Sequence, residues 1–375
     1  MRVVHLSTIH QALDVRIFHK ECRTVAAGGY RVHYLVADPP APELAGVVFH
    51  AFRRPSRAFR YWRICNRLLN VYRQAAALRA HVYHFHDPEL IPVGILLKLT
   101  GARVIYDVHE DSPQEAISLN RDRPLAGRLK SLVWRVFEAA AMPALDAFIC
   151  ATPRIARKFP RAKTITVHNF PRLDEFPPLP PCHPCSRSAS RPNHVVYVGG
   201  ITAIRGALEM VQAMSLLPAQ LQAKLVLVGD FLPPELKAEA ERLPGWDRVE
   251  ALSWQPRDAV VQQLLDAKVA LVLIHPERDH LDALPNKLFE YMAAGLPVVA
   301  SDFPLWRRII EGAGCGLVVD PLDTRAIAGA VRYLLEHPEE AEAMGKRGRQ
   351  AVLAEYNWET EARKLLGLYR ELEAS

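Results

Sequence analysis

Side chains that could recognise a phosphorylated sugar gather in one short segment of this sequence, DALPNKLFEYMAAG, which begins at Asp282. A proline near its start and a glycine at its end suit a helix, on which Asn286 and Glu290 share a face because they are four residues apart. The carboxylates of Asp282 and Glu290 can accept hydrogen bonds from vicinal hydroxyls, and Lys287 in the first turn can meet a phosphate. A surface helix with a solvated Lys–Glu pair is the alternative, but Glu290 interrupts an apolar run, where a charge needs a partner.

A glycine-rich turn follows a β-branched run that ends at Val198: Gly199 and Gly200 begin the turn, and Arg205 and Gly206 end it. Glycines let a ligand approach the backbone closely. The helix expected after the turn offers free amides and the positive end of its dipole, and Arg205 can neutralise a diphosphate. The turn therefore suits phosphate, with an ordinary strand-to-helix connection as the alternative.

Histidines and aspartates follow two further apolar runs: His84 and His86 stand in YHFHD, and Asp107 and His109 stand in YDVHED. Each pair falls where a buried strand should end, and the carboxyl ends of parallel strands meet at one edge of a sheet, where α/β proteins bind small ligands. A lone histidine is more often structural. Two such groups at consecutive strand ends predict a functional site that includes His86, Asp107 and His109.

Polar residues also follow the first apolar run, Val3–Leu6, and they include His10, Asp14 and Arg16. We expect all three on the same ligand-binding side of the sheet. For Asp14 the alternative is a plain helix N-cap.

The elements that must position these groups alternate between strands and helices. Strands are expected at Val3–Leu6, Val32–Val36, Val82–Phe85, Val104–Tyr106, Ala147–Cys150, His194–Val198, Lys224–Val228, Val249–Leu252, Val269–Ile274, Pro297–Ala300 and Gly316–Val319. Helices are expected at Val15–Ala27, Arg63–Leu78 and Trp358–Leu372. Alternation of this kind predicts an α/β fold with parallel sheets covered on both faces.

Seven prolines between residues 171 and 193 interrupt this alternation. We therefore expect two doubly wound domains that face a central cleft, one at 1–170 and one at 194–357, joined by a linker at 171–193. Residues 358–375 are expected to form a C-terminal helix that packs back on the N-terminal domain.

Composition supports two ordinary globular domains in these 375 residues, since 50% are hydrophobic and 23% are charged. This balance excludes disordered, fibrous and disulfide-knotted chains. The charge is unevenly divided: residues 1–170 carry 25 Lys and Arg against 13 Asp and Glu, and the remainder carries 22 against 28. The start, MRVVHLSTIH, lacks a secretory pattern, and no apolar run reaches 18 residues, so a cytoplasmic chain that does not span a membrane is expected.

The DALPNKLFEYMAAG segment, together with the GLPVVAS that continues it, resembles glycosyltransferase family 4, whose members are retaining, nucleotide-sugar-dependent enzymes of the GT-B fold. The likeness covers nearly the whole chain, and the NKLFEYMAAGLPVVASDFP stretch is similar to a subgroup active in bacterial polysaccharide and lipopolysaccharide assembly. The resemblance implies that Glu290 binds the donor ribose and that His109 lies beside the donor sugar. Asp282 stands where the family has Glu.

The glycine-rich turn also resembles a family motif, G-R-x4-K-G. Gly200 stands where that motif has Arg, and Arg205 stands where it has Lys. Lys287 can compensate for the missing cation. The resemblance makes Gly199, Gly200, Arg205 and Glu290 donor-binding residues, and His109 and Asp282 catalytic residues. Asn286 and Lys287 join the donor-binding residues because of their place on the same helix. From their places at strand ends, the residues expected on the acceptor side or in the cleft are His10, Asp14, Arg16, His86 and Asp107.

We expect a transferase that needs no metal and no other cofactor. The sequence contains no Asp-x-Asp, the motif with which metal-dependent glycosyltransferases commonly hold a divalent cation. Arg205, Lys287 and helix N-termini would stabilise the departing diphosphate instead. In such retaining enzymes the acceptor hydroxyl enters on the face from which the diphosphate leaves, so no side-chain nucleophile is assigned.

A run of arginines with interleaved aromatics lies between Arg53 and Arg79. This pattern suits either a solvated helix face or an anionic membrane surface, which a lipid-linked acceptor would require. RNA binding is the weaker alternative, since no nucleic-acid motif accompanies the run, and we expect no nucleic-acid partner. Two rival functions also stay open: a nucleotide-sugar epimerase of the same fold, and a non-catalytic scaffold of a polysaccharide assembly complex.

Overall fold

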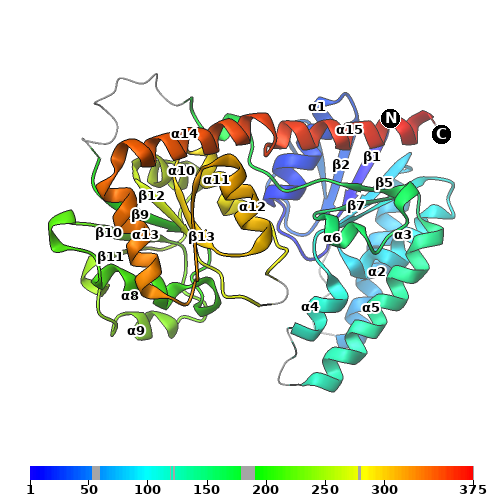
Figure 1. Cartoon of the computed structure of the whole chain (residues 1–375). Helices are drawn as coiled ribbons and strands as arrows, with labels where there is room; N and C mark the ends of the chain where they lie inside the picture. Colours follow the sequence, from blue (N-terminus) through cyan, green and yellow to red (C-terminus); the bar gives the residue numbers. More distant parts are fainter. Residues whose placement is uncertain (53–59, 119, 121–122, 179–190, 278–279, 375) are drawn as a thin grey trace. The chain divides into compact units, whose positions relative to one another are not determined.

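The computed structural model describes residues 1–52, 60–118, 120, 123–178, 191–277 and 280–374, and of residues 60–64 it describes the backbone alone. These residues form two compact α/β units (Figure 1). The first comprises residues 1–169 and the C-terminal segment from Glu359, and the second comprises Phe170–Trp358. The expected α/β fold with two parallel-sheet domains is confirmed.

The first unit is built on an eight-stranded sheet of order β3-β4-β2-β1-β5-β6-β7-β8, in which only the short β3 runs antiparallel to its neighbour. Its strands are β1 (Arg2–Leu6), β2 (Arg31–Val36), β3 (Glu43–Leu44), β4 (Val47–Ala51), β5 (Val82–Phe85), β6 (Arg103–Val108), β7 (Ala147–Cys150) and β8 (Thr164–Thr166). The strand order reverses direction between β1 and β5. In doubly wound sheets, ligands bind beyond the carboxyl ends of the strands at such a reversal.

Helices connect the strands of the first unit. They are η1 (Val15–Cys22), α1 (Arg23–Ala27), α2 (Arg60–Ala77), η2 (Pro88–Leu90), α3 (Ile91–Lys98), α4 (Ser112–Ser118), α5 (Pro124–Ala144), α6 (Pro153–Ala156), η3 (Arg161–Lys163) and α15 (Trp358–Ala374), whose residues from Glu359 belong to this unit. The single helix expected at Val15–Ala27 is in fact a π-helix, η1, followed by one turn of α-helix. Such π-helical turns are rare and occur frequently at functional sites.

The second unit has a six-stranded, wholly parallel sheet of order β11-β10-β9-β12-β13-β14. Its strands are β9 (His194–Val198), β10 (Lys224–Val228), β11 (Val249–Leu252), β12 (Val269–Val272), β13 (Val298–Ser301) and β14 (Gly316–Val319). Here the order reverses between β9 and β12. The glycine-rich turn that follows β9 therefore lies at the edge where ligands bind in this fold class.

The helices of the second unit are η4 (Leu173–Glu175), η5 (Ala203–Arg205), α8 (Ala207–Ser215), η6 (Ala219–Leu221), α9 (Leu236–Ala240), η7 (Trp246–Arg248), α10 (Arg257–Asp266), α11 (Asn286–Ala293), α12 (Pro304–Ala313), α13 (Thr324–Glu336) and α14 (Pro338–Ala354). The helix expected in DALPNKLFEYMAAG is α11. Pro285, expected in the first turn, directly precedes the helix at its N-cap position, and Gly295 adopts the left-handed backbone (φ +73°) just beyond its end, as the sequence predicts.

The central strands are buried on both faces, as parallel strands covered by helices should be. β5 shows this most clearly, because all four of its residues, Val-Tyr-His-Phe, are buried. This strand is apolar apart from His84, so a titratable side chain lies inside the sheet's own core. His5 on the neighbouring β1 is equally buried.

Most of the expected linker, residues 179–190, lies outside the described residues. The same is true of the first arginines of the basic run, residues 53–59, and no side chain is described for residues 60–64. Among those that are described, Arg67 forms an ion pair with Glu89 (2.8 Å), whereas Arg73 and Arg79 are exposed. Of the described helices, none is long and apolar enough to cross a bilayer.

Candidate functional site

The turn after β9 is shaped by glycines at two close approaches. Gly199 has φ +117°, and a Cβ on it would lie 3.1 Å from the Lys287 ammonium. A Cβ on Gly229, which follows β10, would lie only 2.3 Å from the Gly199 carbonyl oxygen. Larger side chains would therefore force the turn away from the neighbouring loop and from Lys287.

Arg205 and Gly200 are brought together in this turn. The Arg205 guanidinium donates a hydrogen bond to the Gly200 carbonyl (Nη1···O 3.2 Å), and the Tyr197 hydroxyl donates to the same oxygen (2.9 Å). Arg205 itself is exposed, and Gly206 after it adopts the left-handed conformation (φ +73°) that begins α8. The turn thus holds an exposed cation beside the N-terminus of a helix, an arrangement that suits an anion.

Lys287 is the most unusual cation of the second unit. Its ammonium lies 3.8 Å from the centre of the Tyr197 ring, and within the described part of the chain it is buried without a hydrogen-bond partner. Burial, and then the neighbouring Arg205, lower the pKa of Lys287 well below that of a free lysine. An ammonium that is desolvated and not hydrogen-bonded is costly, which is expected where a ligand supplies the missing charge.

Glu290 lies one helical turn beyond Asn286 on α11 but already has a partner. Its Oε1 is 2.7 Å from Nη2 of Arg257, and the same guanidinium donates to Glu175 (2.7 and 2.9 Å). Burial opposes the charged form of Arg257, but the two carboxylates outweigh it and raise the pKa of Arg257. Sequence reasoning missed Arg257, because this residue belongs to none of the motifs. The only signal for it was that a charged Glu290 within an apolar run needs a partner.

Asp282 lies exposed in the turn before α11, and Asn286 is the first residue of the helix. Two further groups near the turn were not anticipated. Nε2 of His275, which follows β12, is 3.1 Å from Oε1 of Glu209 on α8. Lys287, Glu209 and Thr202 each keep a buried polar atom that no described residue hydrogen-bonds, so the carboxyl edge of this sheet is rich in unsatisfied groups.

In the first unit the central feature is a buried ion pair between Arg16 and Asp107. The guanidinium donates through Nε and Nη2 to the two carboxylate oxygens (3.1 and 2.9 Å), and through Nη1 to the Val167 carbonyl (2.9 Å). Burial alone would raise the pKa of Asp107, but Arg16 and then His109 hold it well below its usual range. Asp107 is thus an ionised acceptor inside the protein.

His86 and His109 both face this carboxylate, as their places in consecutive motifs predict. Nε2 of His109 is 3.0 Å from Asp107 Oδ2, and Nδ1 of His86 is 3.3 Å from the same oxygen. Burial lowers the pKa of His86 to about 4, so its ring is neutral. The His109 side chain retains 16% exposure and is the accessible member of the group.

His10 and Asp14 have different surroundings. Nδ1 of His10 is 2.8 Å from Asp87; burial opposes its protonation, but the bond to Asp87 raises the pKa of His10. Asp14 caps η1, because its carboxylate accepts from the backbone amides of Arg16 (2.8 Å) and Ile17 (2.9 Å). The structure therefore places Asp14 in the N-cap role that the sequence left open, and Arg16 against Asp107.

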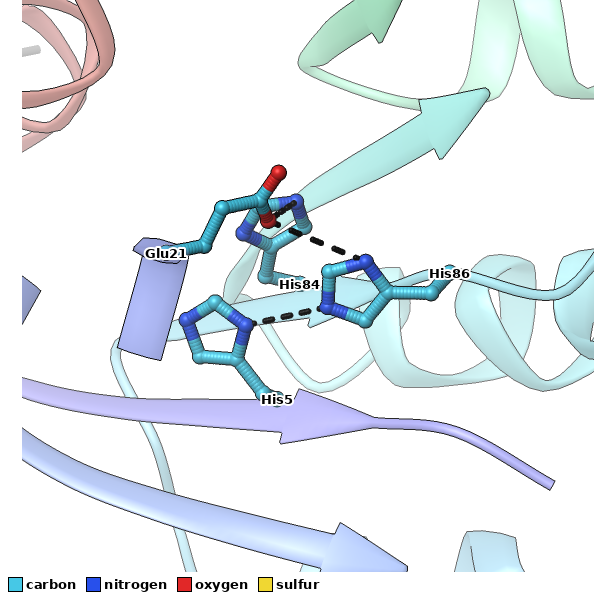
Figure 2. A group of neighbouring side chains, drawn as sticks. All are labelled: His5, Glu21, His84 and His86. Carbon is cyan, nitrogen blue, oxygen red and sulfur yellow. Dashed lines mark hydrogen bonds and ion pairs between the residues drawn. The ribbon is translucent and has the colours of Figure 1, made fainter. Parts of the chain in front are cut away.

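Behind these groups lies a second set of titratable side chains, His5, Glu21, His84 and His86, shown in Figure 2. Nδ1 of His5 is 3.0 Å from Nε2 of His86, while Glu21 Oε2 lies 3.8 Å from both His84 and His86. Glu21 Oε1 is 3.0 Å from Arg16 Nε, yet among the described residues neither Glu21 oxygen has a hydrogen bond of good geometry. Burial raises the pKa of Glu21 well above its usual range.

Two combinations of these side chains are close enough to share one metal ion: His5, Glu21, His84 and His86, and His86, Asp107 and His109. Imidazole and carboxylate are ligands of zinc and of redox metals. However, the Arg16 guanidinium already lies against both carboxylates, Asp107 and Glu21. A divalent cation there would meet a fixed positive charge, so these residues fit a hydrogen-bonded ion-pair network better than a metal centre.

Two family models match the chain: Glycosyl transferase 4-like domain over residues 15–169, and Glycosyl transferases group 1 over residues 184–351. Together they include most of both sheets and most of the groups described above, but they leave out β1 and the residues His5, His10, Asp14 and Glu175. The chain belongs to the GT-B glycosyltransferases. The resemblance seen in the sequence is confirmed at this level.

Named relatives of this glycosyltransferase act on different sugars. D-rhamnosyltransferase WbpZ of Pseudomonas aeruginosa is 26% identical over 365 residues, which are 92% of this chain and 90% of that protein. Alpha-D-kanosaminyltransferase of Streptomyces kanamyceticus is 27% identical over 183 residues, 48% of this chain but only 45% of that protein.

Solved structures share the fold of this glycosyltransferase over its whole length. Sucrose-phosphate synthase from Thermosynechococcus elongatus superposes with a TM-score of 0.78 at 20% identity, covering 100% of this chain and 99% of that one. Anabaena Alr3699/HepE in complex with UDP superposes with a TM-score of 0.74 at 14% identity, covering 99% and 100%.

Proposed function

We propose that this glycosyltransferase moves a hexose-type sugar, with retention of configuration, from a nucleotide-sugar donor to a glycan or lipid-linked acceptor in bacterial cell-surface polysaccharide synthesis. The observation that carries the donor assignment is Lys287, a buried ammonium beside Gly199 that no described residue hydrogen-bonds. A diphosphate bound at the glycine-rich turn would supply the missing negative charge. HepE, which shares the fold, has been solved in complex with UDP.

In this proposal the leaving diphosphate is stabilised without a metal ion. Arg205, Lys287 and the N-terminus of α8 would neutralise the charge that develops as the bond to the sugar breaks. The acceptor hydroxyl enters on the same face and passes its proton to the departing phosphate oxygen. His109 and Asp282 would orient the sugar, and Glu290 would accept hydrogen bonds from the ribose hydroxyls.

We place the enzyme in the cytoplasm, peripheral to the inner face of the membrane, where a lipid-linked acceptor is reached. Helix α5 supports this placement because its exposed face is apolar. Five large aliphatic side chains between 43% and 79% exposed lie on it: Leu125, Leu129, Leu132, Val133 and Val136. Their spacing makes one stripe roughly 100° wide along the helix. The opposite face, which is buried, carries Gly127, Ser131, Glu138 and Ala141.

Basic residues accompany this α5 stripe, since Arg128, Lys130 and Arg135 are all exposed and the helix's one acidic residue, Glu138, is buried. A second copy of the chain docking through the same stripe would bring like charges together. An anionic bilayer satisfies both the apolar and the basic side chains. Membrane contact is thus better supported on α5 than on the arginine run where the sequence suggested it.

Vesicle flotation tests the membrane contact. The triple variant Leu125→Gln, Leu129→Gln, Val136→Gln should lose binding to vesicles that contain phosphatidylglycerol, about tenfold or more. Leu99→Gln is the matched control, because Leu99 is also 79% exposed in the first unit but lies off the stripe. Equal binding by the triple variant and the parent, or binding that ignores anionic lipid, would remove this part of the proposal.

A donor screen tests the transferase itself. A nucleotide sugar at 100 times its dissociation constant should stabilise the fold by about 2.7 kcal/mol. An epimerase would convert that donor without an acceptor, and a scaffold would bind none of the panel. Transfer should also survive EDTA; loss of activity in EDTA that manganese restores would refute the metal-free mechanism.

A further inference from the structure

A continuous chain of hydrogen bonds runs through the interior of the first unit, from Tyr369 on α15 towards His109 beyond β6. The Tyr369 hydroxyl lies 2.8 Å from Nδ1 of His84 and 3.3 Å from Nε2 of His5. Nδ1 of His5 lies 3.0 Å from Nε2 of His86, whose Nδ1 reaches Asp107. Apart from His109, every residue that takes part in these hydrogen bonds is buried.

The ionised Asp107 sets the direction of these hydrogen bonds. Its carboxylate accepts hydrogen bonds from two N–H groups of Arg16 and has no hydrogen of its own to donate. Nε2 of His109, at 3.0 Å, must therefore carry a hydrogen. Nδ1 of His86 lies 3.3 Å from the carboxylate oxygen and 3.3 Å from Nε2 of His109, and the ionised oxygen is the better partner for it, so we assign a hydrogen to this nitrogen as well. Because the buried His86 ring is neutral, its other nitrogen, Nε2, is a lone pair.

The same reasoning fixes each group behind His86. His5 must donate from Nδ1 to that lone pair, so its Nε2 accepts from the Tyr369 hydroxyl. The Tyr369 oxygen then accepts from Nδ1–H of His84. Burial lowers the pKa of both His5 and His84, so both rings are neutral and each holds a single ring hydrogen.

The reverse direction fits less well. It would place a lone pair of His86 Nδ1 3.3 Å from the ionised Asp107. It would also end on an N–H of His84 facing Glu21 Oε2 at 3.8 Å, beyond hydrogen-bond distance. A lone pair facing the carboxylate oxygen at one end and an unused donor at the other oppose this arrangement.

We infer that Tyr369 is a positioning residue for His109: its hydroxyl closes a chain that holds His5 and His86 in one tautomer and so keeps His109 donating from Nε2 to Asp107. In its neutral form His109 then has its lone pair on Nδ1, where it can accept a hydrogen bond from a sugar hydroxyl. The inference rests on the proposed function only in taking His109 as the residue that meets the sugar. The tautomers themselves can be measured without any substrate.

Nitrogen-15 NMR of the imidazole rings tests the inference on the full chain. The parent should show Nδ1–H tautomers for His5, His84 and His86, and Nε2–H for His109. In Tyr369→Phe, His5 and His84 lose their shared partner, so their signals should move towards a mixture of tautomers. The kcat for transfer should fall about tenfold while the KM for the donor stays unchanged, because donor groups lie in the other unit.

Two comparisons separate positioning from packing. Tyr30→Phe is the matched control. The Tyr30 hydroxyl donates to Glu373 (3.3 Å) and takes no part in the hydrogen bonds between Tyr369 and the histidines, so the tautomers and the kcat of this variant should be those of the parent. His84→Asn can place an amide N–H where Nδ1–H stands and should keep the parent tautomer of His5, whereas His84→Leu should lose it. If Tyr369→Phe folds poorly, the two His84 variants still test the same hydrogen bonds.

An Nε2–H tautomer of His86 in the parent would overturn the inference, and so would a Tyr369→Phe variant with the parent's ring signals. A parent chain that transfers no sugar but shows the expected tautomers and their loss in Tyr369→Phe would refute the proposed function and leave the hydrogen-bond chain standing.

Discussion

The two units treat their buried cations in opposite ways. In the first, Arg16 is paired with the ionised carboxylate of Asp107 and also lies against Glu21 and a backbone carbonyl, so its charge is balanced inside the protein. In the second, Lys287 lies against the Tyr197 ring, and no described residue hydrogen-bonds it. Balanced charges hold a geometry that exists before any ligand arrives, whereas an unbalanced one is stabilised when a ligand binds. The comparison predicts that damage in the first unit affects stability and turnover, and damage in the second affects donor binding.

The largest effect should follow Arg16→Met. This change leaves Asp107 and Glu21 buried without their cation, which costs about 3–5 kcal/mol of unfolding free energy. Urea denaturation measures the loss, with the exposed Arg157→Met of the same unit as the control, expected to match the parent. If Arg16→Met is as stable as the parent, the first unit does not depend on the Arg16–Asp107 ion pair, and the proposed difference between the two units is wrong.

His109→Gln should lower turnover about a hundredfold and leave the dissociation constant of the donor nucleotide unchanged. The reason is that His109 belongs to the first unit, whereas the proposed donor groups all lie in the second. Steady-state kinetics and calorimetry on one preparation give both numbers, with the exposed His81→Gln as the control. Weaker nucleotide binding without loss of kcat would reverse the assignment of roles.

Glu290→Ala should weaken donor binding about tenfold and remove most turnover, since a carboxylate that accepts from ribose hydroxyls is lost. It also leaves Arg257 paired with Glu175 alone. Glu250→Ala, an exposed change on β11, is the control. Near-parental kinetics in Glu290→Ala would show that Glu290 serves only its ion pair with Arg257, and the donor site would have to be reassigned.

The smallest effect is a dependence of donor binding on pH. The diphosphate needs the protonated ammonium of Lys287, and burial with Arg205 lowers the pKa of this group. Affinity should therefore be full below the lowered pKa and fall, several-fold, as the pH rises through it, before a free lysine would titrate. In Lys287→Met this decline should vanish, and a decline that persists would assign the titration to another group.

The sequence predicted what depends on local pattern. Nearly every expected strand is present within two residues, because apolar β-branched runs between helical segments signal buried parallel strands. The donor helix was equally readable from its proline and glycine boundaries. Three strands were not predicted: β3 (Glu43–Leu44) and β8 (Thr164–Thr166) are short or polar and carry little periodicity, whereas β4 (Val47–Ala51) is an apolar run that was overlooked. Long helices such as α5 and α14 were expected only as unspecified helices between strands or were given no bounds.

The parts of the site that escaped prediction are pairings between distant positions. Arg16 and Asp107 are 91 residues apart, and Tyr369 meets His84 across 285. Each residue alone suggested a helix start, a strand end or a C-terminal helix, and only the folded sheet brings them together. The roles of Asp14 and Arg16 could not be chosen from sequence, because an N-cap and a ligand contact use the same residue types.

Calorimetric titration of UDP and GDP into the full chain and into Lys287→Met tests whether the buried ammonium binds the donor diphosphate. The parent should bind one of the two nucleotides, and Lys287→Met should bind it at least tenfold more weakly, while its unfolding free energy is equal to or above the parent's because an unbalanced buried charge is gone. Parental affinity in Lys287→Met, or a marked loss of stability, would contradict it, since the ammonium would then serve the fold and not the donor.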